Sequence, residues 1–472
     1  MNALPRLPAA PSGTWLVGSV PLLASILFAA LQPKIDLDVG LSFALLGLML
    51  SIQLVASVRG RSHTAADASV LVFGLLFLLM APVVQISVLG FNLVNTTHAV
   101  PGLIVETNLA CSLFIGAYLL ARLTIARSPV ALPVVAGARQ AHNNLFALFC
   151  LTGLCLFITL VSIPFAGARA ADGSITPVLL AFRKFLFFVP TAMFLIVLAE
   201  YKASGTQRNF AHVMLLVLLF VCIVATQNPG TEKRNALGPV YLSVLFLMFR
   251  PWLQRKGVQV FWLVLVLLVL FPLSSLFTHV RFQYLSEDDF KLTVLSDHFL
   301  STHYDAWANV YTSIEMVGRN GLSAGKQLLG ALLFYVPSSW WPSKPLATGI
   351  EIGNFLENYY TMWFTNLSAP LMAEGFLDFG YIGVAVYGAL LALAVGRIER
   401  WASPQRAAVL QAVAIYLGFF LVFLLRGSMM IAFAYGSGAL TAFAFSWLML
   451  GLFKMAAPAR RLALPSLPGA TS

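Results

Sequence analysis

The stretches Tyr335-Val-Pro-Ser-Ser-Trp-Trp-Pro-Ser-Lys344-Pro345 and Ala373-Glu-Gly-Phe-Leu-Asp-Phe-Gly-Tyr-Ile-Gly383 lie in and at the end of one long polar interruption in a chain of apolar runs. Most other connections between the apolar runs span roughly 10 to 20 residues, which is too short to build a site alone. We therefore expect the chemistry of the protein to be concentrated in this segment.

The composition is that of an integral membrane protein. Of the 472 residues, 59% are hydrophobic and 10% are charged, about two fifths of the charge that a soluble domain carries. Apolar runs of about 20 residues match the hydrocarbon thickness of a bilayer, and a helix satisfies its own backbone hydrogen bonds there. The sequence predicts an all-α polytopic membrane protein.

Twelve transmembrane helices are predicted. The first, from Trp15 to Leu31, is followed by Gln-Pro-Lys rather than by a small-residue cleavage site, which favours a span over a signal peptide. The predicted spans cover residues 15–31, 40–58, 69–91, 101–121, 145–165, 178–199, 210–226, 236–249, 258–277, 376–396, 407–425 and 430–452.

The connections fall into two sets that differ in charge. One set carries 17 of the 29 basic residues but only three acidic ones, Asp67, Glu200 and Glu399. By the positive-inside rule this set is cytoplasmic, together with both termini. The net charge of +11 is then a signal of membrane topology and does not indicate a nucleic-acid partner.

The predicted topology divides the chain into residues 1–277 with nine spans, an external segment 278–375 and residues 376–472 with three spans. Apolar residues recur at helical spacing between His298 and Leu333, which predicts helices lying along the membrane interface. Trp340 and Trp341 are placed either to anchor the segment at headgroup depth or to stack on sugars.

Basic residues on the external side form a second pattern. Lys233, Arg234, Arg281 and Arg319 lie in external connections, and Arg426 falls between two apolar spans. An ionisable residue within membrane spans is a functional-site hypothesis by default. Arg183-Lys184, near the external end of the sixth span, either belong to this group or extend to the interface.

Arginine side chains beside a membrane suit a phosphate-bearing lipid. The guanidinium group binds phosphate oxygens in pairs and stays charged. Such arginines would take over the charge neutralisation that a divalent metal provides elsewhere. We expect no metal site and no cofactor, because the acidic run Glu287-Asp288-Asp289 is contiguous and its side chains diverge, and because the four cysteines lie in apolar spans.

Several external side chains are candidate general bases. A glycosyl transfer needs a group that removes a proton from the acceptor hydroxyl. The leading candidates are Glu374, Asp305 and His303, with Glu351 and Glu357 next.

From about residue 225 to 440 the chain resembles the Wzy-type polymerases of bacterial oligosaccharide repeat units, which act in O-antigen and lipopolysaccharide synthesis. The resemblance is carried by the Pro-rich turn 337–345, by Glu374-Gly-Phe-Leu-Asp-Phe-Gly380-Tyr-Ile-Gly383 and by Arg426-Gly-Ser. Arg319 and Gly330, which is eleven residues further on, also fall near a spacing seen in some members. Asp378 stands where many relatives have asparagine.

The resemblance implies a metal-independent membrane glycosyltransferase with a fold of the GT-C kind, in the bacterial inner membrane. Its substrates would be undecaprenyl-diphosphate-linked oligosaccharides, delivered to the periplasmic face by a flippase, with a chain-length regulator as a further partner. Arg234, Arg281, Arg319, Arg426 and Lys344 would hold the diphosphates, with Lys233, Trp340 and Trp341 nearby, and Glu374, Asp305 or His303 would be the base.

Two alternatives remain open. An O-antigen ligase, or another lipid-diphosphate-dependent glycosyltransferase, would use the same donor and the same arginines with a different acceptor. A twelve-span transporter of polysaccharide or lipid is the non-enzymatic alternative, although its long connection normally follows the sixth span rather than the ninth.

The charge asymmetry predicts the outcome of a topology experiment. A reporter fused within residues 289–302 should read as periplasmic, and one fused at Ser403 should read as cytoplasmic. Alkaline phosphatase and green fluorescent protein fusions report the two sides. The reverse pattern would contradict the orientation and the external position of the site.

Overall fold

The computed structural model describes residues 12–32, 35–58, 61–126, 145–163, 177–204, 210–229, 232, 234–270 and 298–456. Its regular elements are all helical within these residues, apart from isolated bridges such as Arg61 with Arg255. The all-α prediction is therefore confirmed for the described part of the chain.

The helices of the first half are α1 (Ser12–Gly18), α2 (Val20–Leu31), α3 (Leu37–Val58), α4 (Ala66–Phe73), α5 (Ala81–Leu89), α6 (Pro101–Ala126), α7 (Leu145–Ser162), α8 (Pro177–Ser204) and α9 (Phe210–Thr226). A π-helix, Gly74–Met80, joins α4 to α5, so that the two form one apolar rod.

The second half contains α10 (Arg234–Met248), α11 (Arg250–Leu253), α12 (Lys256–Leu265) with a π-helical end (Val266–Leu270), a 3₁₀ turn (Thr302–Tyr304), α15 (Ala306–Asn320), α16 (Lys326–Leu332), α17 (Thr348–Tyr360), α18 (Leu371–Trp401), α19 (Ala408–Arg426) and α20 (Met429–Ala456).

Eight helices of the described chain are long and apolar enough to cross a membrane. Four shorter apolar helices, α2, α9, α10 and α12, lie where four more spans are predicted. The structure thus shows a helical, membrane-type architecture, and the number of twelve spans stays a prediction.

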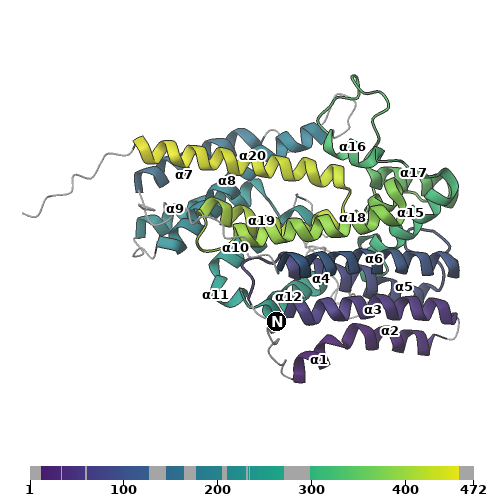
Figure 1. Cartoon of the computed structure of the whole chain (residues 1–472). Coiled ribbons are helices and arrows are strands. Elements are labelled where there is room, and N and C mark those ends of the chain that lie inside the picture. Colours follow the sequence, from purple (N-terminus) through teal and green to yellow (C-terminus); the bar gives the residue numbers. More distant parts are fainter. Residues whose placement is uncertain are drawn as a thin grey trace, which may run out of the picture.

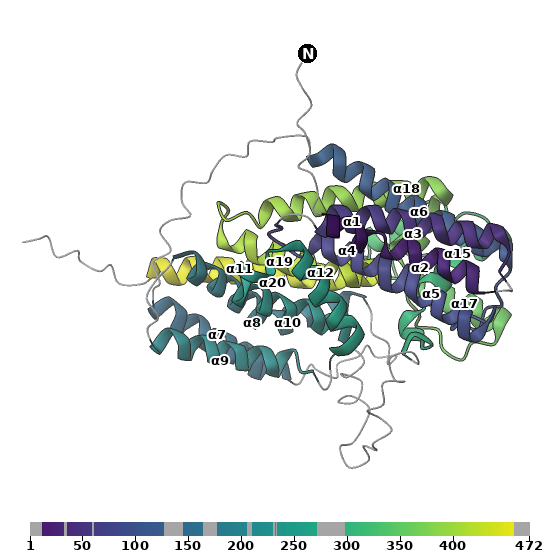
Figure 2. The same cartoon turned by 90° about the horizontal axis from the view of Figure 1, so that it is seen from below.

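Two groups of helices meet at α19. In one group α3 packs on α2 and α6, and α6 packs on α18; in the other α8 packs on α9 and α20, and α7 packs on α9 (Figures 1 and 2). Helix α19 contacts α4, α8, α10, α18 and α20. Its aromatic side chains, such as Tyr416 and Phe420, fill the space between the groups.

Where the structure describes them, the connections of the two sets lie at opposite ends of the bundle. At the basic end the Ser62 amide donates to Gln254 (2.9 Å), Arg250 donates to the carbonyl of Ala402 (2.8 Å), and Lys454 pairs with Glu200 (2.8 Å). Helices α15, α16 and α17 gather at the other end (Figure 1). The grouping of the connections agrees with the sequence prediction, and which end faces the cytoplasm remains predicted.

Helix α15 is buried, which differs from the prediction of an interfacial helix. Trp307, Val310 and Tyr311 are each at most 1% exposed. The Trp307 indole donates to Asn108 (2.9 Å), and the Asn95 amide donates to Asn309 (2.9 Å). The apolar spacing predicts one lipid-facing stripe, but α5, α6 and α18 pack around the helix. Asn108 of α6, Asn95 and Ser368 provide hydrogen-bond partners for its polar side chains.

A kink in α18 brings two glycines into contact. Gly380 has φ 62° and ψ −147°, a conformation that favours glycine, and it separates a short first part from the long remainder of α18. A Cβ atom on Gly383 would lie 2.0 Å from the carbonyl oxygen of Gly375. The glycines of the predicted motif therefore permit a close backbone approach across the kink.

Substitution of Gly383 by alanine should destabilise the protein strongly, because the obstructing atom belongs to the backbone and cannot rotate away. A lowered thermal unfolding temperature of the detergent-solubilised protein, or poor accumulation in the membrane, is expected. Gly451→Ala on α20 is the matched control, since a Cβ atom there meets nothing within 4 Å. Equal stability of both variants would contradict the close approach.

Candidate functional site

A polar cavity of about 470 Å³ lies at the end of the bundle where α15 to α17 gather. Its walls come from the outer end of α8, the turn between α19 and α20, and the segments 347–350 and 366–368. The charged and polar side chains that line it are Arg183, Lys184, Gln227, Glu232, Asn366, Ser368, Arg426 and Ser428.

Arg426 lies on the cavity wall and contacts the buried carboxylate of Asp305. The Arg426 Nη2 atom is 3.6 Å from Asp305 Oδ1 and donates to the carbonyl of Thr302 at 3.3 Å. Arg426 is 20% exposed and Asp305 is 1% exposed. The structure thus brings together two of the residues that the sequence singled out, from segments more than one hundred residues apart.

Asp305 is surrounded by hydrogen-bond donors. Ser368 Oγ donates to Oδ1 at 2.6 Å, and the Asn309 side chain donates to Oδ2 at 2.9 Å. These donors and the nearby guanidinium satisfy the hydrogen-bonding capacity of the buried carboxylate. Ser368 lines the cavity, so its hydrogen bond links Asp305 to the cavity wall.

Lys184 supplies a second cation to the wall. It is 5% exposed, and its Nζ donates to Gln227 Oε1 at 3.0 Å and lies over the rings of Phe188 and Tyr435. Gly438 on α20 makes this packing feasible, since a Cβ atom there would lie 2.4 Å from the carbonyl oxygen of Ala181 on α8. Among the described residues, no carboxylate lies within ion-pair distance of Lys184.

Arg183 is the third cation, and Glu232 is its partner at 2.7 Å. Both side chains line the cavity and are partly buried. Among the residues of the wall that the structure describes, three cations stand against one carboxylate, and this excess positive charge is suited to an anionic ligand.

Glu374 is 1% exposed and caps the start of α20. Its Oε1 accepts from the Met429 amide at 2.9 Å and from Ser428 Oγ at 3.3 Å, while Oε2 is buried and has no hydrogen-bond partner among the described residues. A carboxylate at a helix N-terminus satisfies free amides and interacts favourably with the helix dipole. Like Asp305, Glu374 does not line the cavity itself and accepts a hydrogen bond from a serine that does.

Asp378 caps the start of α16, as Glu374 caps the start of α20. Its two oxygens accept from the amides of Gln327 (3.0 Å) and Leu328 (2.8 Å). Asparagine has only one acceptor oxygen, whereas the carboxylate serves both amides. The i,i+4 pair Glu374 and Asp378 therefore ties α18 to α20 and to α16.

Arg319 is not brought to the cavity. It lies at the far end of α15 from Asp305, about 20 Å away at 1.5 Å per residue. Its guanidinium pairs with Glu315 (2.7 Å) and stacks over Tyr359. The predicted diphosphate role is therefore not supported by its position.

Lys344 and the two tryptophans form a separate turn. Lys344 Nζ donates to the carbonyls of Phe334 (2.6 Å) and Val336 (2.8 Å), and burial lowers the pKa of its ammonium group. Trp340 is 83% exposed, and the Trp341 indole donates to Ser343. Lys344 closes this turn rather than facing the cavity.

His303 is exposed in the 3₁₀ turn that precedes Asp305, and its ring lies 5.7 Å from that of His298. Lys233 and Arg281 lie outside the described residues, as does the acidic run 287–289. Arg234 begins α10, but its side chain is not described. Over the described ranges, no group of three or more His, Cys, Asp or Glu side chains is arranged to hold a metal ion.

Sequence reasoning placed Arg426, Asp305 and Glu374 among the candidates and left Lys184 undecided. It did not identify Ser368, Ser428, Gln227 or Glu232 as site residues. A polar residue at the end of an apolar run, as in Thr226-Gln-Asn-Pro, is the available signal. The serines carry no signal of their own, because their position depends on tertiary contacts.

Comparisons of the chain with models of protein families, with curated proteins and with solved structures found no match.

The cap contributed by Glu374 predicts different outcomes for two substitutions. Glu374→Gln keeps an oxygen that accepts from the Met429 amide and should retain most of the stability, whereas Glu374→Ala should lose about 0.5 to 2 kcal/mol. Thermal unfolding measures the difference. Glu357→Ala is the control, because the side chain of Glu357 is exposed. Equal losses for glutamine and alanine would show that the negative charge, not the cap, is required.

Proposed function

We propose that the protein polymerises undecaprenyl-diphosphate-linked oligosaccharide repeat units at the periplasmic face of the inner membrane and releases lipid diphosphate. The observation that carries this proposal is the cavity at one end of an apolar helix bundle, where Arg183, Lys184 and Arg426 face a common space. The resemblance of residues 225–440 to Wzy-type polymerases favours the same reading.

The cavity has the charge and position that a lipid diphosphate requires. Its polar end would receive the phosphates, and the apolar bundle beside it would face the lipid. The ammonium group of Lys184 is buried and donates to the side-chain amide oxygen of Gln227. A cation that is removed from water in this way gains from an anionic partner. Arg426 adds a planar group that binds phosphate oxygens in pairs.

The proposed reaction joins two repeat units. A hydroxyl of one unit attacks the anomeric carbon of the other, the bond from that carbon to the diphosphate oxygen breaks, and the diphosphate leaves with the electron pair. Arginine and lysine side chains stabilise the charge that develops on the leaving group. The hydroxyl proton passes to a base, for which Asp305 and Glu374 are the buried candidates and His303 is the exposed one.

The position of the two carboxylates constrains how they would act. Ser368 Oγ donates to Asp305, and Ser428 Oγ donates to Glu374, and both serines line the cavity. A proton from the acceptor would reach either carboxylate through the serine hydroxyl or after that hydroxyl rotates aside. Of the two carboxylates, Asp305 is the one that contacts a cation of the cavity wall, Arg426.

Two alternative functions, a ligase and a transporter, would bind the same lipid-linked glycan in this cavity. A ligase, or another glycosyltransferase with a lipid-diphosphate donor, would transfer the glycan to a different acceptor. A transporter would move the lipid-linked glycan without forming a glycosidic bond. Product analysis separates the three, because only a polymerase yields a ladder of chains that differ by one repeat unit.

A comparison of two arginines tests the proposal. Arg426→Ala should lower chain extension by more than tenfold, since each charge-assisted hydrogen bond lost is worth about 1.5 to 3 kcal/mol. Arg319→Ala, which is far from the cavity, should retain activity. Extension of purified lipid-linked repeat units is measured with excess chelator, because arginine replaces a metal in this proposal.

Two further variants guard against misfolding in the alanine variant. Arg426→Lys keeps a charge opposite Asp305 and should restore part of the activity, because an ammonium group cannot reproduce the paired contact. Lys184→Met should lower activity in a protein that still accumulates. Full extension by Arg426→Ala, or complete loss with chelator and recovery with magnesium, would rule out the proposed role of the cations.

A further inference from the structure

A second, apolar cavity adjoins the polar one at Arg426. It has a volume of about 90 Å³ and shares Phe423, Arg426 and Gly427 with the polar cavity. Its other walls are apolar and come mainly from α10, α12 and α19. Arg426 therefore lies at the junction of a space lined by charges and a space lined by hydrocarbon.

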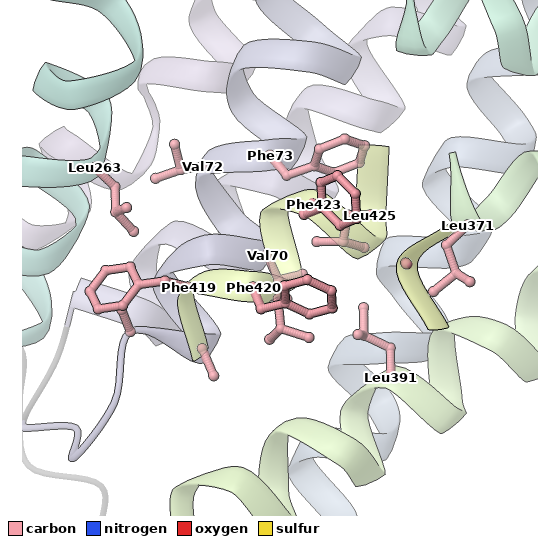
Figure 3. Packing of buried hydrophobic residues seen from close by; sticks show 14 of the residues in the cluster. Val70, Val72, Phe73, Leu263, Leu371, Leu391, Phe419, Phe420, Phe423 and Leu425 are labelled. Atoms are coloured by element: carbon pink, nitrogen blue, oxygen red, sulfur yellow. The ribbon is translucent and has the colours of Figure 1, made fainter. Parts of the chain in front are cut away.

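The apolar cavity is followed by a third, smaller one of about 20 Å³. The two share Leu242 of α10, Leu263 of α12 and Phe419 of α19, and the smaller one extends toward Leu253 at the basic end of the bundle. Figure 3 shows Phe419 and Leu263 on the same side of α19, away from Phe420. We call these two cavities together the apolar track.

The backbone of α10 leaves room for the track. Gly238 lines it, and a Cβ atom on Gly238 would meet no heavy atom within 4 Å. Pro239 follows within the helix, and a proline there removes one hydrogen bond and bends the helix. On the opposite wall α12 changes to the π-helix Val266–Leu270, whose first residues line the track.

We propose that the apolar track binds the first units of the hydrocarbon tail of a lipid whose anionic head lies at Arg426. The identity of the head as a diphosphate rests on the proposed function. Charge complementarity selects this occupant: the Arg426 Nε atom is buried and has no hydrogen-bond partner among the described residues, at the point where the polar and apolar spaces meet. An amphiphile with an anionic head would place its charge in the polar cavity and its hydrocarbon in the apolar track.

The volume limits how much of a tail the track holds. An apolar cavity of about 150 Å³ accepts one benzene molecule, so that about 90 Å³ accommodates only the first few carbons. The remainder of the tail would lie in the bilayer. Because lipid is as apolar as the track, hydrophobic transfer into it contributes little to affinity. The track instead fixes the direction of the bond between head and tail, so that a side chain filling the track also moves the head away from Arg426.

Filling the track tests this proposal. Gly238→Phe places a ring in the open space beside Gly238, and Gly153→Phe on α7 is the matched control, since Gly153 also has nothing within 4 Å. The dissociation constants of farnesyl diphosphate and inorganic diphosphate are measured for the full chain in nanodiscs. Val422→Phe, on the α19 wall of the track, is the second variant.

Gly238→Phe and Val422→Phe should each raise the dissociation constant of farnesyl diphosphate about tenfold, which corresponds to about 1.4 kcal/mol. The dissociation constant of inorganic diphosphate should not change in either variant. Gly153→Phe should leave the binding of both compounds unchanged. If both variants bind farnesyl diphosphate with unchanged affinity, the proposed binding of the tail in the track is overturned, but the proposed binding of the head by the cations is not. If the unaltered protein binds neither compound, the proposed function fails together with the track. Cross-links from a tail-borne diazirine to α7 rather than to α10 or α19 would also overturn it.

Discussion

The arrangement of the site depends on the two carboxylates of α18 that cap neighbouring helices. Glu374 holds the amide of Met429, and Asp378 holds the amides of Gln327 and Leu328. The first contact fixes the turn from α19 to α20, and Arg426 stands three residues before Met429 in that turn. A cap worth only about 1 kcal/mol thus helps to determine where Arg426 points, and the kink at Gly380 places both carboxylates on the short first part of α18.

The buried polar groups divide into those that hold the fold and those that face the cavity. Asn309, Asp305 and Ser368 satisfy one another in the interior, and a set of this kind is destabilising only when a member lacks its partner. Lys184 and Arg426 differ, because their charged groups border open space and are only partly compensated. An anionic ligand would complete their interactions, which is the physical basis of the proposed function.

The sequence predicted the fold class because composition and span length depend on local residues. It also placed the chemistry in the external segment 278–375, whereas the cavity draws as well on α8 and on the turn between α19 and α20. It also selected Asp305, Glu374 and Arg426, since charged residues near apolar runs are costly to place without a role. It did not separate them from Arg319 and Lys344, which the structure pairs with Glu315 and with backbone carbonyls. Ser368 and Ser428 were not found, because a serine acquires its position only from contacts between distant segments. The buried state of α15 was missed for the same reason: helical spacing reports an apolar face, and neighbouring helices decide whether that face meets lipid or protein.

The account places an anionic lipid head between Lys184 and Arg426, with its tail leaving past Phe423. The most direct measurement is a cryo-electron microscopy structure of the full chain in nanodiscs with an isoprenyl diphosphate bound. Density for two phosphates within hydrogen-bond distance of Arg426 and Lys184, continuing between α10 and α19, is the predicted result. Phosphate density at Arg319 or in the Lys344 turn, with the cavity filled by water alone, would contradict the account.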